Sequence, residues 1–508
     1  MIKQKQMRMC LFFSFIIGIL VPIYIYYSNY GFSLGYGYIC ILMSSFIIAI
    51  SIGYHVRVQK TFDIFSPFII PNVLFIFIYI LKPVYILFTG EVGVGEFDVH
   101  PITDVEIRAF NEANLYCLIS IFVYNITLHF FLSAKRHDYF EKIKPKFKEN
   151  LYSVLQSRIL NILGVVSIIF TLSTILFLFE RAGGITNYLD SLALRNVYLK
   201  DLGYLLMIAN MSKILLFVYT ARILSERRYN KKNLLIWLIF LIVSIALLLL
   251  TGGRSAILYG VMTLFIMVHY LKKQVSVTTS IIGGGTLFFF VVIVYRVVLR
   301  DKYFKANDDL STFTILINAI KDFPRYFFGG YDVLQFDALL TLLANKAQYT
   351  FLYGETLLAA LVSPIPRSLY PEKGHGAMAY FTKTFFPHFY YPNNVEVNVS
   401  YIGEMYLNFG LLGIIVGMFI LALVLGVMYK RFIMNQSVIC FFIYTITIVR
   451  VISLIRGDIF NFWVYYIQDI APIILVLLFL GIGNKKKKTE SMVRMNTDVN
   501  AKAQKNIT

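Results

Sequence analysis

The sequence predicts an all-α polytopic membrane protein with about 12 transmembrane helices. Three observations support this fold class. The 508-residue chain is 58% hydrophobic and only 15% charged, whereas soluble domains carry about 25% charged residues. Predominantly apolar runs recur along the chain, most of them about the 20 residues that cross a bilayer. Lys and Arg gather in alternate connections between these runs, as they do at the cytoplasmic side of a membrane.

Each apolar run is expected to be a helix, because the backbone must satisfy its own hydrogen bonds in lipid. Residues 1–298 form a nine-helix region, and residues 403–483 add three more spans. A lysine-rich tail, residues 484–508, is polar enough to be disordered. The expected spans are residues 10–28, 31–54, 64–88, 109–133, 159–179, 203–224, 234–250, 255–271, 276–298, 403–428, 436–454 and 460–482.

The net charge of +19 has two competing explanations, an acidic partner such as nucleic acid or the topology of a membrane protein. If the chain starts inside, the inner segments hold 28 of the 47 Lys and Arg and 7 of the 28 Asp and Glu, a net +21. The rest of the chain then carries −2. We therefore expect both termini in the cytoplasm and no nucleic-acid partner.

One external segment is much longer than the others. Residues 299–402 lie between the ninth and tenth spans, and a connection of this length is expected to be ordered and functional. It contains an amphipathic stretch, residues 331–343, and an apolar run that ends in Pro364-Ile365-Pro366. These stretches predict helices that lie on or dip into the outer face. A small soluble cap is the alternative.

Motifs for nucleotide-driven chemistry are missing. The chain has no GxxxxGK[ST], no GxGxxG after a strand and no HExxH. The adjacent acids Asp308 and Asp309 precede Leu310-Ser311-Thr312 as at the start of a helix, so we expect no metal site and no cofactor. Catalysis at the outer face would need an already activated substrate.

Cationic residues stand out at two places on the predicted outer face. Arg254 lies in a glycine turn, Thr251 to Ser255, between the seventh and eighth spans. Arg367, Lys373 and His375 follow one another in the proline-rich stretch Pro364 to Gly376. An arginine held by prolines matches a phosphate or pyrophosphate bidentately, and His375 adds a titratable nitrogen. The alternatives are a snorkelling arginine and a solvated loop.

Further charged residues border the membrane. Glu404, near the outer end of the tenth span, is costly there unless it is paired or functional, so it could act as a base or orient an arginine. Arg195 and Lys200 lie in an external loop, where simple solvation is the alternative. Intramembrane charges are either functional or structural ion pairs. They are Lys213, Arg296, Arg450, Arg456, Asp458 and Asp469.

At these residues the chain resembles the Wzy-type polymerases of bacterial O-antigen and capsule repeat units. The resemblance rests on four stretches: Thr251 to Ser255, Tyr353-Gly354-Glu355 leading into Pro364 to Lys373, Ile402 to Gly410, and Arg456-Gly457-Asp458. It implies a GT-C-like membrane glycosyltransferase in the inner membrane, with its active site towards the periplasm. It also implies lipid-linked donor and acceptor, undecaprenyl-pyrophosphate oligosaccharides, without metal or nucleotide sugar.

The resemblance also implies roles for individual residues and partners for the chain. Arg254 and Arg367 would bind pyrophosphate, with help from Lys373. The base would be His375 or Glu404. Arg456 is a further candidate for a site residue. Some family members carry paired arginine-x10-glycine motifs, and Arg195 does not reproduce that spacing with a glycine. A Wzz-type chain-length regulator and a Wzx-type flippase are the implied partners.

Two other functions fit parts of the pattern. O-antigen ligases share the topology and the late periplasmic loop, but they transfer finished polymer to lipid A core. The Ile402 to Gly410 and Pro366 to Pro371 stretches favour the polymerase. A lipid-linked oligosaccharide flippase would also have about twelve spans, but it is expected to have two related halves and short loops. The segment 299–402 argues against it.

Overall fold

The computed structural model confirms an all-α polytopic membrane protein. It describes residues 18–26, 34–58, 63–93, 99–132, 147, 151–191, 199, 202–226, 230–251, 254–290, 312–321, 323–330, 333–365, 369–393, 395–435 and 437–481. Within these residues, nine helices are long and apolar enough to cross a membrane. The first expected span and the ninth lie partly outside the described residues, and the eighth is a shorter apolar helix, Ser255–Leu271. The number of twelve therefore stays a prediction.

The helices follow the expected order along the chain. Between β1 (Glu91–Val92) and β2 (His100–Pro101) there is one antiparallel ladder. The nine candidate spans are α2 (Leu34–Val58), α3 (Ile70–Ile76) continuing through η2 (Phe77–Leu81) into α4 (Lys82–Thr89), α5 (Asp104–Leu132), α7 (Arg158–Arg181), α10 (Gly203–Ala209) with α11 (Met211–Ser225), α12 (Lys231–Leu250), α22 (Ser400–Asn435), α23 (Val438–Arg456) and the helix Ile459–Gly481. Two shorter helices, α13 (Arg254–Leu271) and α14 (Val277–Phe289), follow α12 in the chain. The shorter external helices are α8 (Ile185–Ser191), α16 (Thr312–Lys321), α17 (Phe323–Phe328), α18 (Gln335–Ala344), η7 (Lys346–Gln348), α19 (Glu355–Leu361), α20 (Ala377–Phe385) and α21 (Pro387–Asn393).

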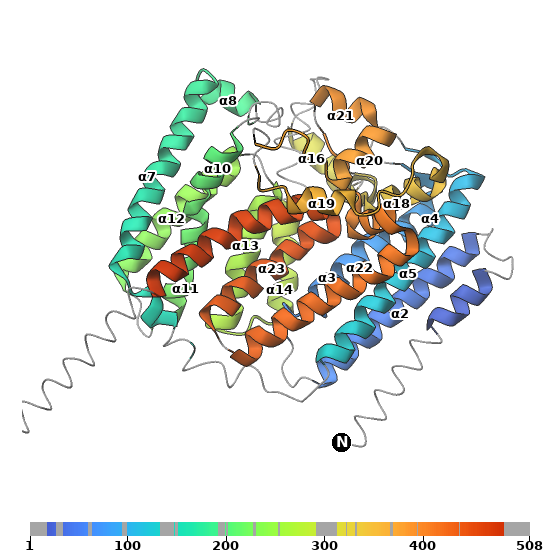
Figure 1. Cartoon of the computed structure of the whole chain (residues 1–508), viewed down its shortest axis with the longest axis horizontal. Coiled ribbons are helices and arrows are strands. Elements are labelled where there is room, and N and C mark those ends of the chain that lie inside the picture. Colours follow the sequence, from blue (N-terminus) through green and yellow to red (C-terminus); the bar gives the residue numbers. More distant parts are fainter. Residues whose placement is uncertain are drawn as a thin grey trace, which may run out of the picture.

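Two large hydrophobic cores hold most of the described helices together, and a small third cluster joins α7, α10 and α12. The first core lies between the first half of α22 and a group of other helices, namely α2, the segment from α3 through α4, α5, α18 and α20. The second core joins α11, α13, α23 and the helix Ile459–Gly481 to the far end of α22. In Figure 1 these groups lie on the right and the left, and α23 runs between them. The helix α22 therefore links both halves of the molecule.

The tenth span differs from the continuous helix that the sequence predicts at 403–428. Gly410 has φ 61° and ψ −148°, a conformation that breaks the helix and that only glycine adopts at little cost. The chain folds back there, so that the Tyr401 hydroxyl donates to the Gly417 carbonyl at 2.9 Å. The freed carbonyls of Leu407 and Asn408 accept from a loop amide each, at 3.1 Å. Glu404 thus lies in a short first piece of α22, Ser400 to Phe409.

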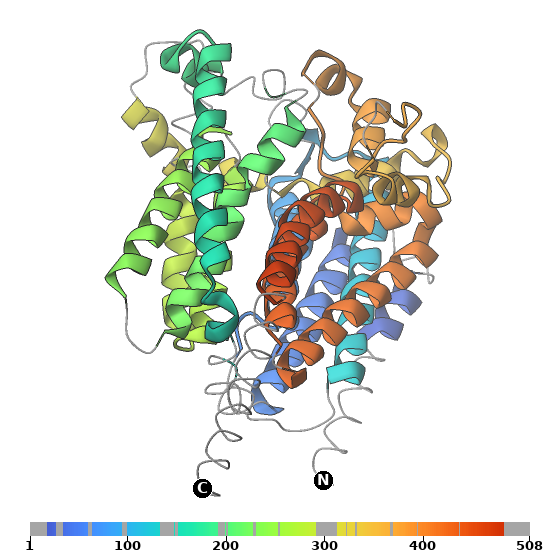
Figure 2. The ribbon, with the colours of Figure 1, turned by 60° about the vertical axis from the view of Figure 1, so that its left-hand side comes forward.

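The external helices gather at one end of the bundle (Figures 1 and 2). The helix α18 is almost wholly buried and packs against α5 and α22. Lys82, inside the second described span, lies 2.9 Å from Asp337 of α18. The described part of 299–402 therefore shares a core with the membrane helices, which favours helices that dip into the bundle over a separate cap.

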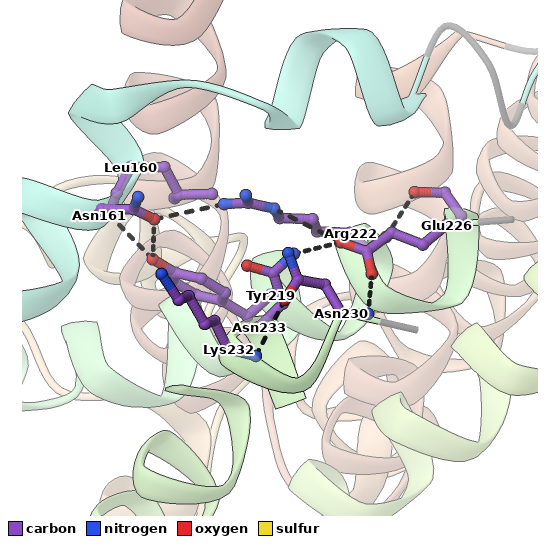
Figure 3. Close-up of polar contacts among 9 residues, drawn as sticks. Leu160, Asn161, Tyr219, Arg222, Glu226, Asn230, Lys232 and Asn233 are labelled. Carbon is purple, nitrogen blue, oxygen red and sulfur yellow. Dashed lines mark hydrogen bonds and ion pairs between the residues drawn. The ribbon is translucent and has the colours of Figure 1, made fainter. Parts of the chain in front are cut away.

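At the end of α11 that lies away from the external helices, polar side chains connect neighbouring helices (Figure 3). Asn161 of α7 accepts hydrogen bonds from the Tyr219 hydroxyl at 2.8 Å and from Arg222 Nη1 at 3.3 Å. Glu226 accepts from the Asn230 amide at 3.2 Å and from the Asn233 side chain. These contacts tie α7, α11 and α12 together, so Arg222, one of the cations in the connections expected at the cytoplasmic side, also has a structural role.

Candidate active site

The candidate active site lies where four segments meet at the end of the bundle that carries the external helices. They are the start of α19, the stretch 373–378 that leads into α20, the stretch 395–409 that includes the first piece of α22, and the connector 456–461 after α23. Glu404, Asp458 and Glu396 are its acidic residues, and we refer to them as the carboxylate cluster.

Glu404 is fully buried and holds two of these segments. One carboxylate oxygen accepts from the Thr356 hydroxyl at 2.9 Å, and the other accepts from the Ile459 amide at 2.6 Å. Asn408, one turn further along, donates to Thr356 and accepts from the Gly354 amide. Because both Glu404 oxygens are occupied by protein donors, this side chain fixes α19 and the connector in place.

Asp458 lies between the stretch 373–378 and the helix Ile459–Gly481. Its carboxylate accepts from the Met378 amide at 3.0 Å and from the Asn461 amide at 2.8 Å. Burial raises the pKa of Asp458, although these amide donors act in the opposite direction. Gly376 permits the close approach, since a Cβ there would lie 2.6 Å from Asp458 Oδ2. The glycine beside His375 therefore serves the packing of Asp458.

Glu396 is the open member of the cluster. Its side chain is exposed, and Asn461 Nδ2 lies 3.4 Å from Oε2. The Val397 amide donates to the Thr382 hydroxyl at 2.7 Å, which ties this stretch to α20. Partial burial of the carboxyl and then the Asp458 carboxylate raise the pKa of Glu396 to about 7, against smaller opposing effects of the Asn461 hydrogen bond and of Lys383. A carboxyl with this pKa exchanges protons readily at neutral pH.

Glu396 is a functional candidate that the sequence alone did not indicate. The signal that could have found it is its place, seven residues before Gly403, in the stretch that joins the long segment to the tenth span. Its neighbours Asp458 and Lys383 come from other segments, and only the fold brings them together. Asp458 had been noted as a charge at a membrane border, and it is now placed at the centre of the site.

The basic residues of the stretch 373–383 differ in exposure. His375 is exposed, and its Nε2 lies 2.9 Å from Lys383 Nζ. Lys373 is buried, donates to the carbonyls of Ser363 and Ile365, and lies 5.7 Å from the centre of the Phe460 ring. These contacts fix the proline-rich loop against the connector. Lys383 and His375 are thus the groups of this stretch that face solvent beside the cluster.

The other expected site residues are only partly described. Arg456 is half-buried at the end of α23, two residues before Asp458. Arg254 begins α13, and its side chain lies outside the description. Arg195 and Arg367 also lie outside the described residues. The structure therefore brings Glu404, Lys373, His375 and Arg456 to one region, and the positions of the other three stay predictions.

A second charged group lies within the membrane helices. Lys213 Nζ of α11 and Arg450 Nε of α23 both lie 2.7 Å from carboxylate oxygens of Asp469. The Arg450 guanidinium lies 5.2 Å from the ring centre of Tyr259 and 5.4 Å from that of Tyr465. All three charged side chains are buried. This buried triad (Lys213, Arg450 and Asp469) is a structural ion-pair group that joins three helices.

Metal coordination was not expected from the sequence. Across the described ranges, no group of three or more His, Cys, Asp or Glu side chains is arranged to hold a metal ion.

The family model described as O-antigen polysaccharide polymerase Wzy matches residues 8–487, nearly the whole chain. No curated protein and no solved structure gives a significant match.

Proposed function

Because the chain belongs to the O-antigen polysaccharide polymerase Wzy family, we propose that it joins undecaprenyl-pyrophosphate-linked repeat units into a surface polysaccharide. The proposed site faces the periplasm from the bacterial inner membrane. The excess of Lys and Arg in the connections expected at the cytoplasmic side supports this orientation. The external helices, gathered at one end of the bundle, would then cover the periplasmic end.

The reaction that we propose transfers the growing chain to a single repeat unit. A hydroxyl of the acceptor sugar attacks the anomeric carbon of the donor's reducing-end sugar. A new glycosidic bond forms, the bond between that carbon and the pyrophosphate oxygen breaks, and undecaprenyl pyrophosphate leaves. The hydroxyl proton passes to a base on the protein. Pyrophosphate is a good leaving group, so the site chiefly needs this base and cations for the developing charge.

The exposed Glu396 carboxylate carries this proposal. It is the member of the carboxylate cluster with an open side, and its pKa of about 7 suits a base at neutral pH. His375, which lies next to Lys383, remains the second candidate for the base. The contacts of Glu404 favour a positioning role over the role of base, since both its oxygens accept from protein groups.

Cations for the pyrophosphate come from the same region. Arg456 and Lys383 lie beside the cluster, and Lys373 fixes the loop that carries Arg367. We propose that Arg254 and Arg367 bind the pyrophosphate groups, as expected from their surroundings in the sequence. Arg195 is retained as a weaker candidate of the same kind.

The test uses the purified full chain and lipid-linked repeat units extracted from cells that lack this gene. A ladder of products without ATP, and unchanged by EDTA, is the expected result. Replacing Arg367 or Arg254 by Ala should leave only single units. Movement of the substrate across vesicles without new bonds would indicate a flippase, and transfer only to lipid A core would indicate a ligase. Normal ladders from both variants would overturn the assignment of the arginines.

A further inference from the structure

A cavity separate from the carboxylate cluster lies between α18, the β1–β2 ladder and the end of α20. Its volume is about 200 Å³. This is more than a few ordered waters occupy and less than the pockets that hold drug-sized ligands, about 300 Å³ or more. It therefore suits a single ring. Its polar lining comes from Asp337, Thr341, Asn345, His100 and Glu106.

The charges of the cavity are already compensated by the protein. Asp337 is 1% exposed and lies 2.9 Å from Lys82, and Glu106 lies 2.8 Å from His100. A cation would compete with Lys82, and an anion would meet two carboxylates. Neither carboxylate oxygen of Asp337 makes a hydrogen bond of good geometry among the described residues, although its own amide and the Gly93 amide lie close enough to interact with it. Such a buried acceptor is costly unless a ligand or water donates to it.

One wall of the cavity is aromatic. Phe385 and Phe386, at the end of α20, line it, and Phe385 is half-buried. Phe385 is braced by Tyr349 and Phe381, whose ring centres lie 6.0 Å and 5.1 Å away. A fixed ring that faces carboxylate, amide and hydroxyl groups matches a molecule with one apolar face and a rim of hydroxyl donors. That description fits a neutral sugar ring better than a charged or a purely apolar ligand.

The helix α20 connects this cavity to the proposed reaction centre. Its first turn donates to Asp458 through the Met378 amide, and its last residue, Phe385, lines the cavity. Nine helical residues span about 13 Å. A polysaccharide that extends from the reaction centre along α20 would therefore reach the cavity. The sugar in the cavity would be one that lies at a distance from the reacting end of the polysaccharide.

We propose that this cavity binds a neutral sugar of the growing polysaccharide and so retains the chain between successive additions. This inference rests on the proposed function for the role of the sugar, but the binding itself does not require catalysis. The two are therefore tested with separate measurements on the full chain in detergent.

The probe for binding is lipid-free oligosaccharide, released by mild acid from the polymer that this protein makes in cells. Saturation-transfer NMR should show binding to the unmodified chain. Phe385→Leu keeps an apolar side chain but removes the ring, and it should weaken binding about fivefold or more. Phe385→Tyr should restore it. Asn345→Ala, which removes a polar group from the lining, should weaken binding without changing the aromatic wall.

The matched control is Phe88→Leu, since Phe88 is an exposed ring at the end of α4 that does not line the cavity. It should leave binding and product length unchanged. In the ladder assay, Phe385→Leu should shorten the products by a larger factor than it slows the first linkage. Thermal melting of each variant identifies any that fail to fold.

The outcomes separate the two proposals. Equal binding by the unmodified chain and by folded Phe385→Leu and Asn345→Ala variants would overturn the cavity proposal, even if a ladder forms. If no ladder forms with the unmodified chain, the proposed function fails, and oligosaccharide binding that depends on Phe385 would still support the cavity. Shorter products from Phe385→Leu with weakened binding would support both.

Discussion

The buried triad and the carboxylate cluster both include residues of α23, of the helix that follows it or of the connector between them. Their charges are nevertheless arranged in opposite ways. In the triad, Asp469 is shared by Lys213 and Arg450, and none of the three reaches solvent. In the cluster, Asp458 and Glu404 are held by protein amides and a hydroxyl, and Glu396 is open on one side.

This difference distinguishes a structural charge from a chemical one. Where an ionised group is surrounded by opposite charges, it stays in one protonation state and joins the helices that carry those charges. Where acids lie close together beside an opening, water is partly excluded and one of them holds its proton up to neutral pH, as Glu396 does. Removing a charge from the triad should therefore impair folding, and removing Glu396 should impair the reaction without impairing folding.

The largest effect is expected for Asp469→Asn. The change leaves Lys213 and Arg450 buried without a counter-charge, and breaking a buried ion pair in this way costs about 3–5 kcal/mol. We expect little folded protein, measured by fluorescence-detected size-exclusion chromatography and by thermal melting in detergent. The matched control, Lys346→Gln at an exposed site, should give normal yield. A well-folded Asp469→Asn variant with a normal melting temperature would contradict a structural role for the triad.

The second effect is expected for Glu396→Gln. The amide keeps the size of the side chain but cannot accept the hydroxyl proton, and loss of a general base lowers rates by about 10²–10⁴-fold. The rate of the first linkage should fall by that factor, with a melting temperature at neutral pH that is not lower than that of the unmodified chain. The control is Glu372→Gln, an exposed carboxylate in the neighbouring loop. If Glu396→Gln is active and His375→Gln is not, the base is His375.

The pH dependence gives a third, smaller effect. Because the base must be ionised, kcat/KM should rise about tenfold per pH unit below 7 and level off above it. The folded chain binds this proton more tightly than a free glutamate does, so its contribution to stability is present at low pH and is lost as the pH rises through 7. Activity profiles and melting curves from pH 5.5 to 8.5 check both signs. Glu396→Gln should remove the acidic limb.

Much of the fold could be predicted from the sequence because bilayer thickness sets the length of an apolar helix. The expected spans 31–54, 109–133 and 436–454 agree with described helices to within a few residues. The break at Gly410 could not be predicted in this way, since the residues on both sides are apolar and helical. Its cause is tertiary, because the loop before α19 donates to the freed carbonyls.

The site was predictable in composition more than in geometry. The sequence indicated Glu404, Lys373, His375 and Arg456, and the fold brings them to one region. The sequence could not indicate that both carboxylate oxygens of Glu404 accept hydrogen bonds from the protein while the Glu396 side chain is exposed to solvent. Donors such as the Ile459 amide come from 55 residues away. Likewise, nothing near Lys82 in the sequence pointed to Asp337 as its partner.

An exposed ion pair, Lys346 with Glu112, tests whether the triad stabilises the fold because it is buried or simply because its charges are paired. Lys346 donates to both oxygens of Glu112 at 2.7 Å, but the lysine side chain is 48% exposed. Exposed pairs contribute only about 0–1 kcal/mol and are screened by salt. Lys346→Gln should therefore shift the melting temperature slightly in low salt and not at all in 0.5 M salt. A loss as large as that of Asp469→Asn would show that charge pairing stabilises this protein wherever it occurs, and the contrast between the two regions would then rest on chemistry alone.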